Sequence, residues 1–123
     1  MKLFPKRLIS NNFDLFGLNT EIEEFGRKQL LSPRQVTAIQ LVLEELCIGH
    51  ILKKMPQRGF ELDFNVAYSE VDDQCEITIS FDGERFDPFE AAAEDDMSLL
   101  IVKRFSKSIN VQFDEKNRID IIV

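Results

Sequence analysis

The segment from Cys75 to Pro88 reads CEITISFDGERFDP. Apolar side chains occupy positions 75, 77, 79 and 81, and polar side chains occupy positions 76, 78 and 80. This period of two predicts a strand with one buried face and one solvated face. The Asp82-Gly83 pair then predicts a turn. Phe81 is therefore expected to point to the buried face, toward the helices of the protein.

Three further segments show the same alternation, at residues 60–68, 108–113 and 119–123. Residues 6–10 are a weaker candidate, expected as a short strand at an edge of the sheet. Turn residues at 70–74 and 115–117 join neighbouring strands as hairpins. Because antiparallel sheets often bury only one face, the pattern predicts such a sheet with helices on one side.

Two capping-box patterns predict the first two helices. At Thr20–Glu23 a hydroxyl and a carboxylate stand three residues apart, which predicts a helix over residues 21–30. Ser32–Gln35 repeats the pattern, with Pro33 at the first helical position, where its missing N–H costs nothing. This second helix is expected to continue to about Lys54.

A third helix is expected after the acidic residues 94–96, with Asp95 or Asp96 as its N-cap. The elements together predict an α+β two-layer sandwich. We expect a mainly antiparallel sheet of four to five strands with about three helices on one face.

The composition limits the classes of function. The 123 residues fit one domain, residues 1–123. A formal net charge of −7 disfavours nucleic-acid binding, which needs basic surface. No apolar run approaches the roughly 20 residues that span a bilayer, and no secretory signal is evident, so we expect a cytoplasmic protein without a membrane partner. Cys47 and Cys75 fit no zinc pattern and are expected to be reduced and buried.

The order of these elements points to a family. A helix carrying Leu41-Val42-Leu43-Glu44-Glu45 precedes the strand and turn at 75–88, and the acidic stretch and two closing strands follow. Over about residues 15–123 the chain resembles the anti-sigma-factor serine kinases of the GHKL (histidine kinase-like ATPase) superfamily. The resemblance implies a Bergerat-type fold with an ATP and Mg²⁺ site. It also implies a protein partner, either a sigma factor or an anti-sigma-factor antagonist.

The resemblance aligns Glu45 with the general base that activates the attacking hydroxyl. Helical winding places Glu45 among mostly apolar residues, where a carboxylate must pair, reach solvent or line a cavity. A purely structural glutamate is an equally open interpretation. The metal-binding asparagine of the family aligns with Gly49, which has no side-chain oxygen, so we expect no metal site. His50 is expected to be a core histidine with a hydrogen-bond partner.

The adenine-binding aspartate of the family aligns with Phe81. A phenyl ring there fills the space of the adenine and cannot accept a hydrogen bond from its amino group. Asp82 would replace the aspartate only if the strand slipped by one residue. Gly83 keeps the first glycine of the family's box, and Phe86 begins the Phe-Asp-Pro run that often follows it. The alternative is a plain turn with Phe86 as a core anchor.

The glycine-rich lid of the family is replaced by an acidic segment. Asp96 and Ser98 stand where the resemblance implies glycine. A capping aspartate neutralises the helix end that would otherwise attract phosphates. Ser98 would still offer one hydrogen bond. Asp82, Gly83, Phe86 and Ser98 are therefore the candidates for a degenerate ATP pocket, with Phe81 as its plug.

These substitutions favour a regulatory protein that binds another protein and has weakened or lost ATP binding. We therefore expect no cofactor, and ATP with Mg²⁺ only if the pocket is still competent. The family's partner surface corresponds to Glu21, Glu23, Glu24, Arg27 and Arg34. A homodimer is a further option.

Two alternatives stay open. The first is an active ATP-dependent protein serine kinase, so enzymatic activity is left undecided. The second is a remodelled pocket that binds another small molecule, lined by Phe81, Phe86, Phe89 and Glu45.

Overall fold

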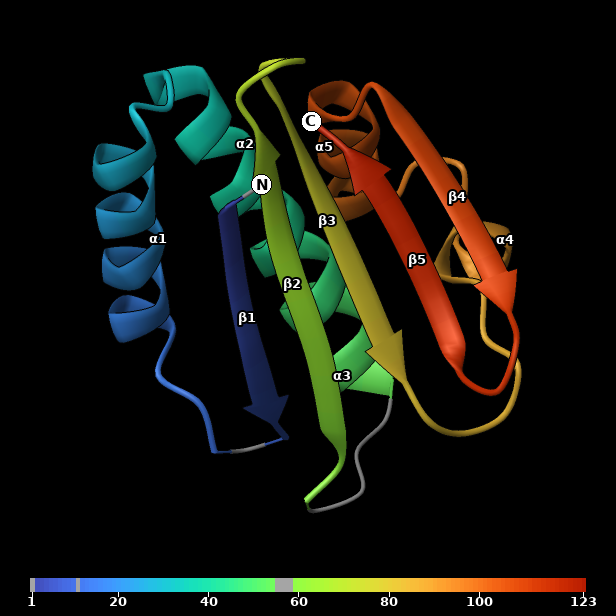
Figure 1. Ribbon diagram of the computed structural model, residues 1–123. Helices are drawn as coiled ribbons and strands as arrows, with labels where there is room; N and C mark the ends of the chain where they lie inside the picture. The colour runs from blue at the N-terminus through green and yellow to red at the C-terminus, as the bar shows by residue number, and fades with distance from the viewer. Residues whose placement is uncertain (1, 11, 55–58) are drawn as a thin grey trace.

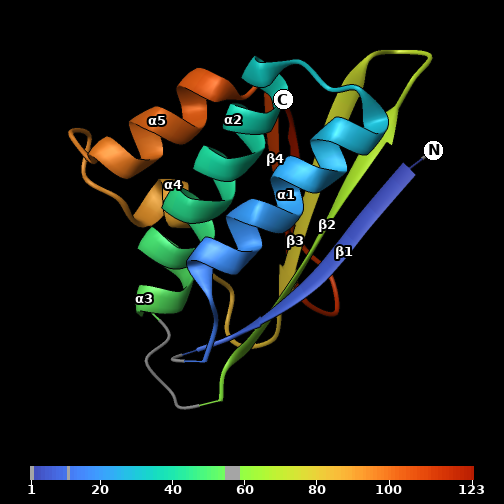
Figure 2. The same cartoon turned by 90° about the vertical axis from the view of Figure 1, so that its left-hand side faces the viewer.

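The computed structural model describes residues 2–10, 12–54 and 59–123. A helical layer covers one face of an antiparallel sheet, as Figures 1 and 2 show. The strand order is β1-β2-β3-β5-β4, and all neighbouring pairs are antiparallel. The expected two-layer α+β sandwich is confirmed. Its strands are β1 (Lys2–Ile9), β2 (Glu61–Ser69), β3 (Gln74–Phe81), β4 (Ser108–Phe113) and β5 (Asn117–Ile122).

Strand β1 differs most from its prediction. It is an edge strand as expected, but it covers Lys2–Ile9 instead of residues 6–10 and pairs with β2 along its whole length. Pro5 lies inside it. An edge strand accepts a proline because only one side of its backbone pairs with a neighbour.

Helix α1 begins earlier than the sequence pattern predicts. It spans Leu15–Gln29, and the side chain of Asp14 accepts a 3.1 Å hydrogen bond from the backbone N–H of Gly17. Thr20 lies inside the helix, where its hydroxyl donates to the carbonyl of Phe16. The local sequence holds two competent caps, and the earlier one satisfies the free amides of the helix.

The second helix runs without a break through its three parts. They are α2 (Pro33–Val42), the π-helical segment η1 (Leu43–Ile51) and α3 (Leu52–Lys54). The capping box is confirmed: the Gln35 amide donates to the Ser32 hydroxyl at 3.1 Å, and the Ser32 amide donates to the Gln35 side chain at 2.8 Å. The sequence gives no sign of the π segment, whose i→i+5 bonding shifts side chains from the positions of an ordinary helix.

This helix, Pro33–Lys54, is long and apolar enough to cross a membrane by length and composition alone. The core helix of a globular protein passes the same test, and half of its most apolar window is buried here. Ile39, Val42, Leu46 and Ile51 are fully buried. Uninterrupted apolar runs within the helix stay short, as expected, because Gln40, Glu44 and Glu45 divide it, and the length test is met only by the average over the segment.

Two helices follow β3. Asp87 begins α4 (Pro88–Ala91) by accepting hydrogen bonds from the amides of Phe89 and Glu90. This short helix adds to the three that were expected. Helix α5 (Met97–Phe105) is the third expected helix, and Asp96 is its N-cap.

Both cysteines lie in the core as free thiols, as expected. Burial raises the pKa of the Cys75 thiol to about 11, and it also raises the pKa of Cys47. A thiol with a raised pKa holds little thiolate at neutral pH and reacts slowly. Both side chains therefore act as small apolar groups.

Asp14→Ala is expected to lower the free energy of unfolding by about 1 kcal/mol, because it removes the acceptor that caps α1. Thr20→Ala is the matched control, and we expect a change below about 0.5 kcal/mol because its exposed hydroxyl caps nothing. Urea unfolding followed by circular dichroism measures both variants. Equal losses, or a larger loss for Thr20→Ala, would place the start of the helix at the later cap.

Candidate functional site

A cavity of about 410 Å³ lies where the C-terminal half of the long helix meets α4 and α5. Both α4 and α5 pack against η1, and Figure 2 shows these elements together in the helical layer. Two of the predicted site residues, Phe86 and Ser98, line the cavity together with Gly49. The other lining side chains are those of His50, Lys53, Lys54, Pro88, Ala92, Ala93 and Asp96.

Asp96 joins α5 to the long helix at the edge of this cavity. Its Oδ1 atom accepts a hydrogen bond from the Leu99 amide at 3.1 Å and lies 3.1 Å from Nε2 of His50. The bond from the Leu99 amide, followed by that from His50, lowers the pKa of Asp96 below its usual value. His50 is 8% exposed and has a partner, as expected. The negative charge of Asp96 thus lies at the N-cap of α5.

Phe81 is the last residue of β3 and is 1% exposed. Its ring meets the rings of Phe60 and Phe86 edge-on, with centroid distances of 6.1 and 6.4 Å. Phe81 is thus buried, as the alternation predicts, and sits directly behind Phe86, which lines the cavity. The phenyl ring cannot accept a hydrogen bond at this position.

Asp82 lies outside the cavity. Strand β3 keeps its register, with Phe81 opposite Leu62 on one side and Asn117 on the other, so the strand does not slip by one residue. The Asp82 side chain is 80% exposed, and its nearest cationic partner is Lys116 at 3.9 Å. It is directed toward solvent and not toward Phe86.

Asn117 holds the segment that follows β3. Its side-chain oxygen accepts from the Phe86 amide at 2.9 Å, and its nitrogen donates to the carbonyls of Glu84 at 3.0 Å and Gly83 at 3.5 Å. Gly83 has φ 120, a conformation that favours glycine, and does not line the cavity. The Arg85 guanidinium lies 4.3 Å from the centre of the Phe113 ring. Arg85 is therefore engaged away from the cavity.

The side chains of Glu45, from the long helix itself, and Ser98, from α5, both lie beside Gly49. A Cβ atom at position 49 would lie 3.5 Å from Ser98 Oγ and 3.8 Å from Glu45 Oε2. Glu45 is half-buried. The predicted base and the predicted lid serine are thus close together, and an added side chain at Gly49 would touch both.

The sequence did not reveal the basic wall of the cavity. Lys53 and Lys54 end the long helix, where lysines ordinarily complement the helix dipole and carry no further signal. Of Phe81, Phe86, Phe89 and Glu45, which were expected to line one pocket, Phe86 lines this cavity, Phe81 packs behind it and Glu45 lies beside Gly49. The cavity is cationic and polar on one part of its surface and apolar on another.

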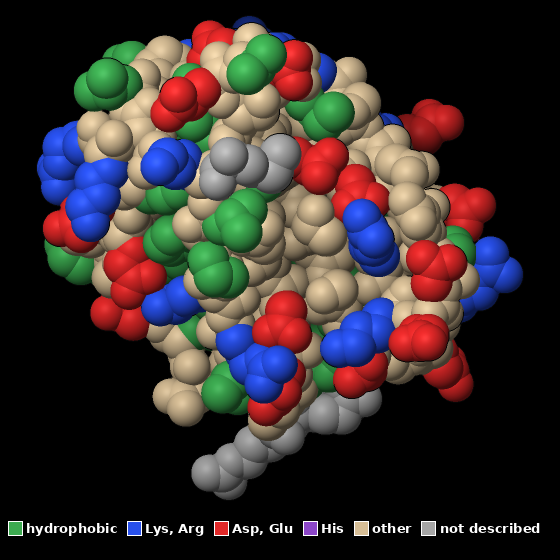
Figure 3. All heavy atoms as spheres, in the orientation of Figure 1, with side chains coloured by type: hydrophobic (Ala, Val, Ile, Leu, Met, Phe, Trp, Pro, Cys, Tyr) green, Lys and Arg blue, Asp and Glu red, His purple; other side chains and the backbone are tan. Residues whose placement is uncertain are grey.

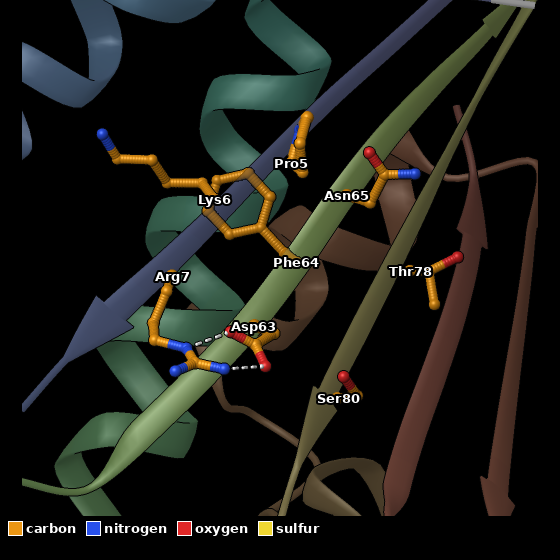
Figure 4. A pocket seen from close by; sticks show the side chains of 8 residues that line it. All are labelled: Pro5, Lys6, Arg7, Asp63, Phe64, Asn65, Thr78 and Ser80. Atoms are coloured by element: carbon orange, nitrogen blue, oxygen red, sulfur yellow. Dashed lines mark hydrogen bonds and ion pairs between the residues drawn. The ribbon is translucent and has the colours of Figure 1, made fainter.

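The uncovered face of the sheet holds a shallow hollow of about 510 Å³ (Figures 3 and 4). Arg7 donates two hydrogen bonds to Asp63 at 2.7 and 3.1 Å, and this pairing lowers the pKa of Asp63. The side-chain oxygen of Asn65 is buried there without a partner among the described residues. Its register neighbour Pro5 has no N–H to donate. None of the predicted site residues lies in this hollow.

Comparisons with known proteins give a fold likeness. No protein-family model matches the chain, and no curated protein is similar to it in sequence. A chain in a crystal structure of the SiaB-SiaC complex from Pseudomonas aeruginosa superposes with a TM-score of 0.67 at 11% identity. The superposition covers 96% of this chain and 88% of that chain. The two chains therefore share a related fold.

Asp96→Asn should change how stability depends on pH. The folded-state pKa of Asp96 is lowered, so its charge stabilises the protein above the unfolded pKa near 4, and this contribution disappears as pH falls through the folded pKa. We expect the variant to be less stable than wild type near pH 6 and the difference to shrink below about pH 4. Urea unfolding across this range measures it.

Asp95→Asn is the control, because Asp95 is exposed and adjacent in sequence. Its stability should follow the pH dependence of wild type. A stability difference for Asp96→Asn that stays constant with pH would contradict the role of the Asp96 charge.

Proposed function

We propose that this protein is a regulatory protein that acts by binding another protein, on a fold related to ATP-binding kinases, with weakened or lost ATP binding. The observation that carries this proposal is the engagement of Asp96 by Leu99 and His50. In the resembling kinases the amides at this helix end meet the phosphates. Here the Asp96 carboxylate lies at this helix end, where the phosphates would bind, and its negative charge repels a polyphosphate.

The residues present do not fit Mg-ATP. Gly49 offers no oxygen where the resemblance implies a metal ligand. Phe81 offers no acceptor for adenine, and Asp82 faces solvent beside Lys116. Glu45 keeps the position of the general base, but phosphoryl transfer depends on positioning and on a metal that neutralises charge.

A protein partner is supported by the fold likeness and by a groove. The similar chain belongs to a protein complex, SiaB-SiaC. Here a groove of about 640 Å³ lies between α1 and α2, with Leu31, Pro33 and Val36 among its apolar lining and Glu23 and Arg27 at its charged positions. An apolar centre with charged surroundings is the usual composition of a protein interface. We propose that a sigma factor or an anti-sigma-factor antagonist binds here.

Leu30 is the most unusual residue of this groove. It is 88% exposed and has φ 58 and ψ 39, the left-handed conformation that usually falls to glycine at a helix end. A bulky side chain in this conformation costs about 1–2 kcal/mol. Because the Leu30 side chain is exposed, it gains no free energy from burial that would offset this conformational cost. A leucine held out in this way fits a contact with a partner, since strained residues gather at functional sites.

Calorimetric titration with ATP or ADP, with and without magnesium, tests the loss of nucleotide binding. We expect no saturable heat and no magnesium effect. A thermal scan provides the second measurement, since a ligand at 100 times its Kd adds about 2.7 kcal/mol of stability. A magnesium-dependent stabilisation by ATP would overturn this part of the proposal.

Leu30→Gly separates partner binding from folding. We expect its free energy of unfolding to stay equal or rise by up to about 1 kcal/mol, because glycine relieves the strain. Capture of the partner from a lysate of the source organism, followed by mass spectrometry, should fail for this variant. Val71→Ala is the control, since Val71 is 95% exposed but lies in the β2–β3 turn. If Leu30→Gly captures the partner as well as wild type does, the groove is not part of the interface.

A further inference from the structure

The cavity between η1, α4 and α5 is lined by two lysines, Lys53 and Lys54, that have no ion-pair partner among the described residues. Residues 55–58, which the structure does not describe, have the sequence MPQR and contain no acid. In a chain of net charge −7, two ammonium groups on one cavity form a local site of attraction for an anion.

Two carboxylates lie near these lysines, and neither is paired with them. Asp96 is the single acid among the described lining residues, and its Oδ1 atom is bonded to the Leu99 amide and to His50 rather than to either lysine. Glu45 lies beside Gly49, which also lines the cavity, and it forms no ion pair with either lysine. Both lysine ammonium groups are therefore available to a ligand.

Another part of the cavity wall is apolar and fixed. Phe86, Pro88 and Ala92 line it. The Phe86 amide is held by Asn117, and its ring rests edge-on against Phe81. A preformed apolar wall beside a few charged groups is the usual composition of a small-molecule site. The volume of about 410 Å³ also lies within the usual range for such sites.

We propose that this cavity binds a small organic anion, a phosphate monoester or a carboxylate with a compact apolar body, without a metal ion. Lys53 and Lys54 hold the anionic group, and the apolar body lies against Phe86 and Pro88. Ser98 supplies a hydroxyl donor. The inference rests on the proposed function, because it assigns to another ligand the cavity that no longer suits Mg-ATP.

Phenyl phosphate is the probe, titrated in EDTA into the ¹⁵N-labelled full chain and followed by NMR. We expect saturable shifts at the amides of Gly49, Lys53 and Ser98. Affinity should exceed that for inorganic phosphate by about tenfold, because the phenyl ring adds apolar contact worth roughly 1.4 kcal/mol. Phenylacetate in a parallel titration shows which anionic group is preferred. Neutral benzyl alcohol should bind far more weakly.

The double variant Lys53→Gln/Lys54→Gln should weaken phenyl phosphate binding at least about tenfold, since charge-assisted hydrogen bonds to the anion are lost. Lys28→Gln/Lys103→Gln is the matched control, with the same change in net charge at two exposed lysines outside the cavity. Binding should survive in that control. Equal weakening in both doubles, or undiminished binding in the first, would overturn the assignment.

The two proposals fail in different ways. If phenyl phosphate and phenylacetate cause no saturable shifts while the partner is still captured without nucleotide, the anion site is wrong and the proposed function stands. If Mg-ATP shifts the same amides and saturates, both proposals are overturned.

Discussion

The five-stranded sheet has one apolar face, and covering that face is the constraint on which the rest of the structure depends. Ile77, Ile79 and Phe81 of β3 alternate toward the helices, and β3 is paired on both sides. A slip of one residue would turn all these side chains to solvent. The register therefore fixes Phe81 inside the core and Asp82 outside it. The same constraint that builds the core places at position 81 a ring that offers no hydrogen-bond acceptor and leaves the Asp82 carboxylate at the surface.

Once β3 ends, the chain must cross from the sheet to the helical layer, and polar side chains direct this crossing. Asn117 holds the backbone of the loop, Asp87 begins α4, and Asp96 begins α5. Capping each helix satisfies amides that would otherwise lack acceptors. The contact of Asp96 with His50 then ties α5 to η1. A requirement of folding thus places a carboxylate at the start of α5, on the lining of the cavity.

Local patterns in the sequence predict most of the fold, because alternation and capping act over a few residues. Strands β2 to β5 and the Ser32 cap follow from such patterns. The start of α1 does not follow from such a pattern, since the local sequence offers both Asp14 and Thr20 as N-caps, and the helix begins after Asp14. The π segment η1 also leaves no local signature.

The site was predictable only in part, because several of its contacts join residues that are far apart in the sequence. Phe81, Phe86 and Ser98 follow from strand alternation and from the resemblance. The pairs His50–Asp96 and Phe86–Asn117 join residues 46 and 31 positions apart, and no local pattern specifies such contacts. Lys53 and Lys54 look like ordinary helix-end lysines until α4 and α5 place a cavity beside them.

One helix borders both surfaces to which we assign binding. The groove that holds Leu30 is lined by the α2 end, at Pro33 and Val36, whereas the anion cavity is lined by the η1 and α3 end, at His50 and Lys53. Two sites are coupled only when each ligand distinguishes two states of an element that they share. Here the shared element contains nine π-helical residues, and π segments in helices frequently lie at functional sites. A ligand that contacts His50 acts directly on this segment, one that contacts Lys53 acts on the adjoining α3, and one in the groove acts on the adjoining α2. Communication between the two sites along this helix therefore passes through η1.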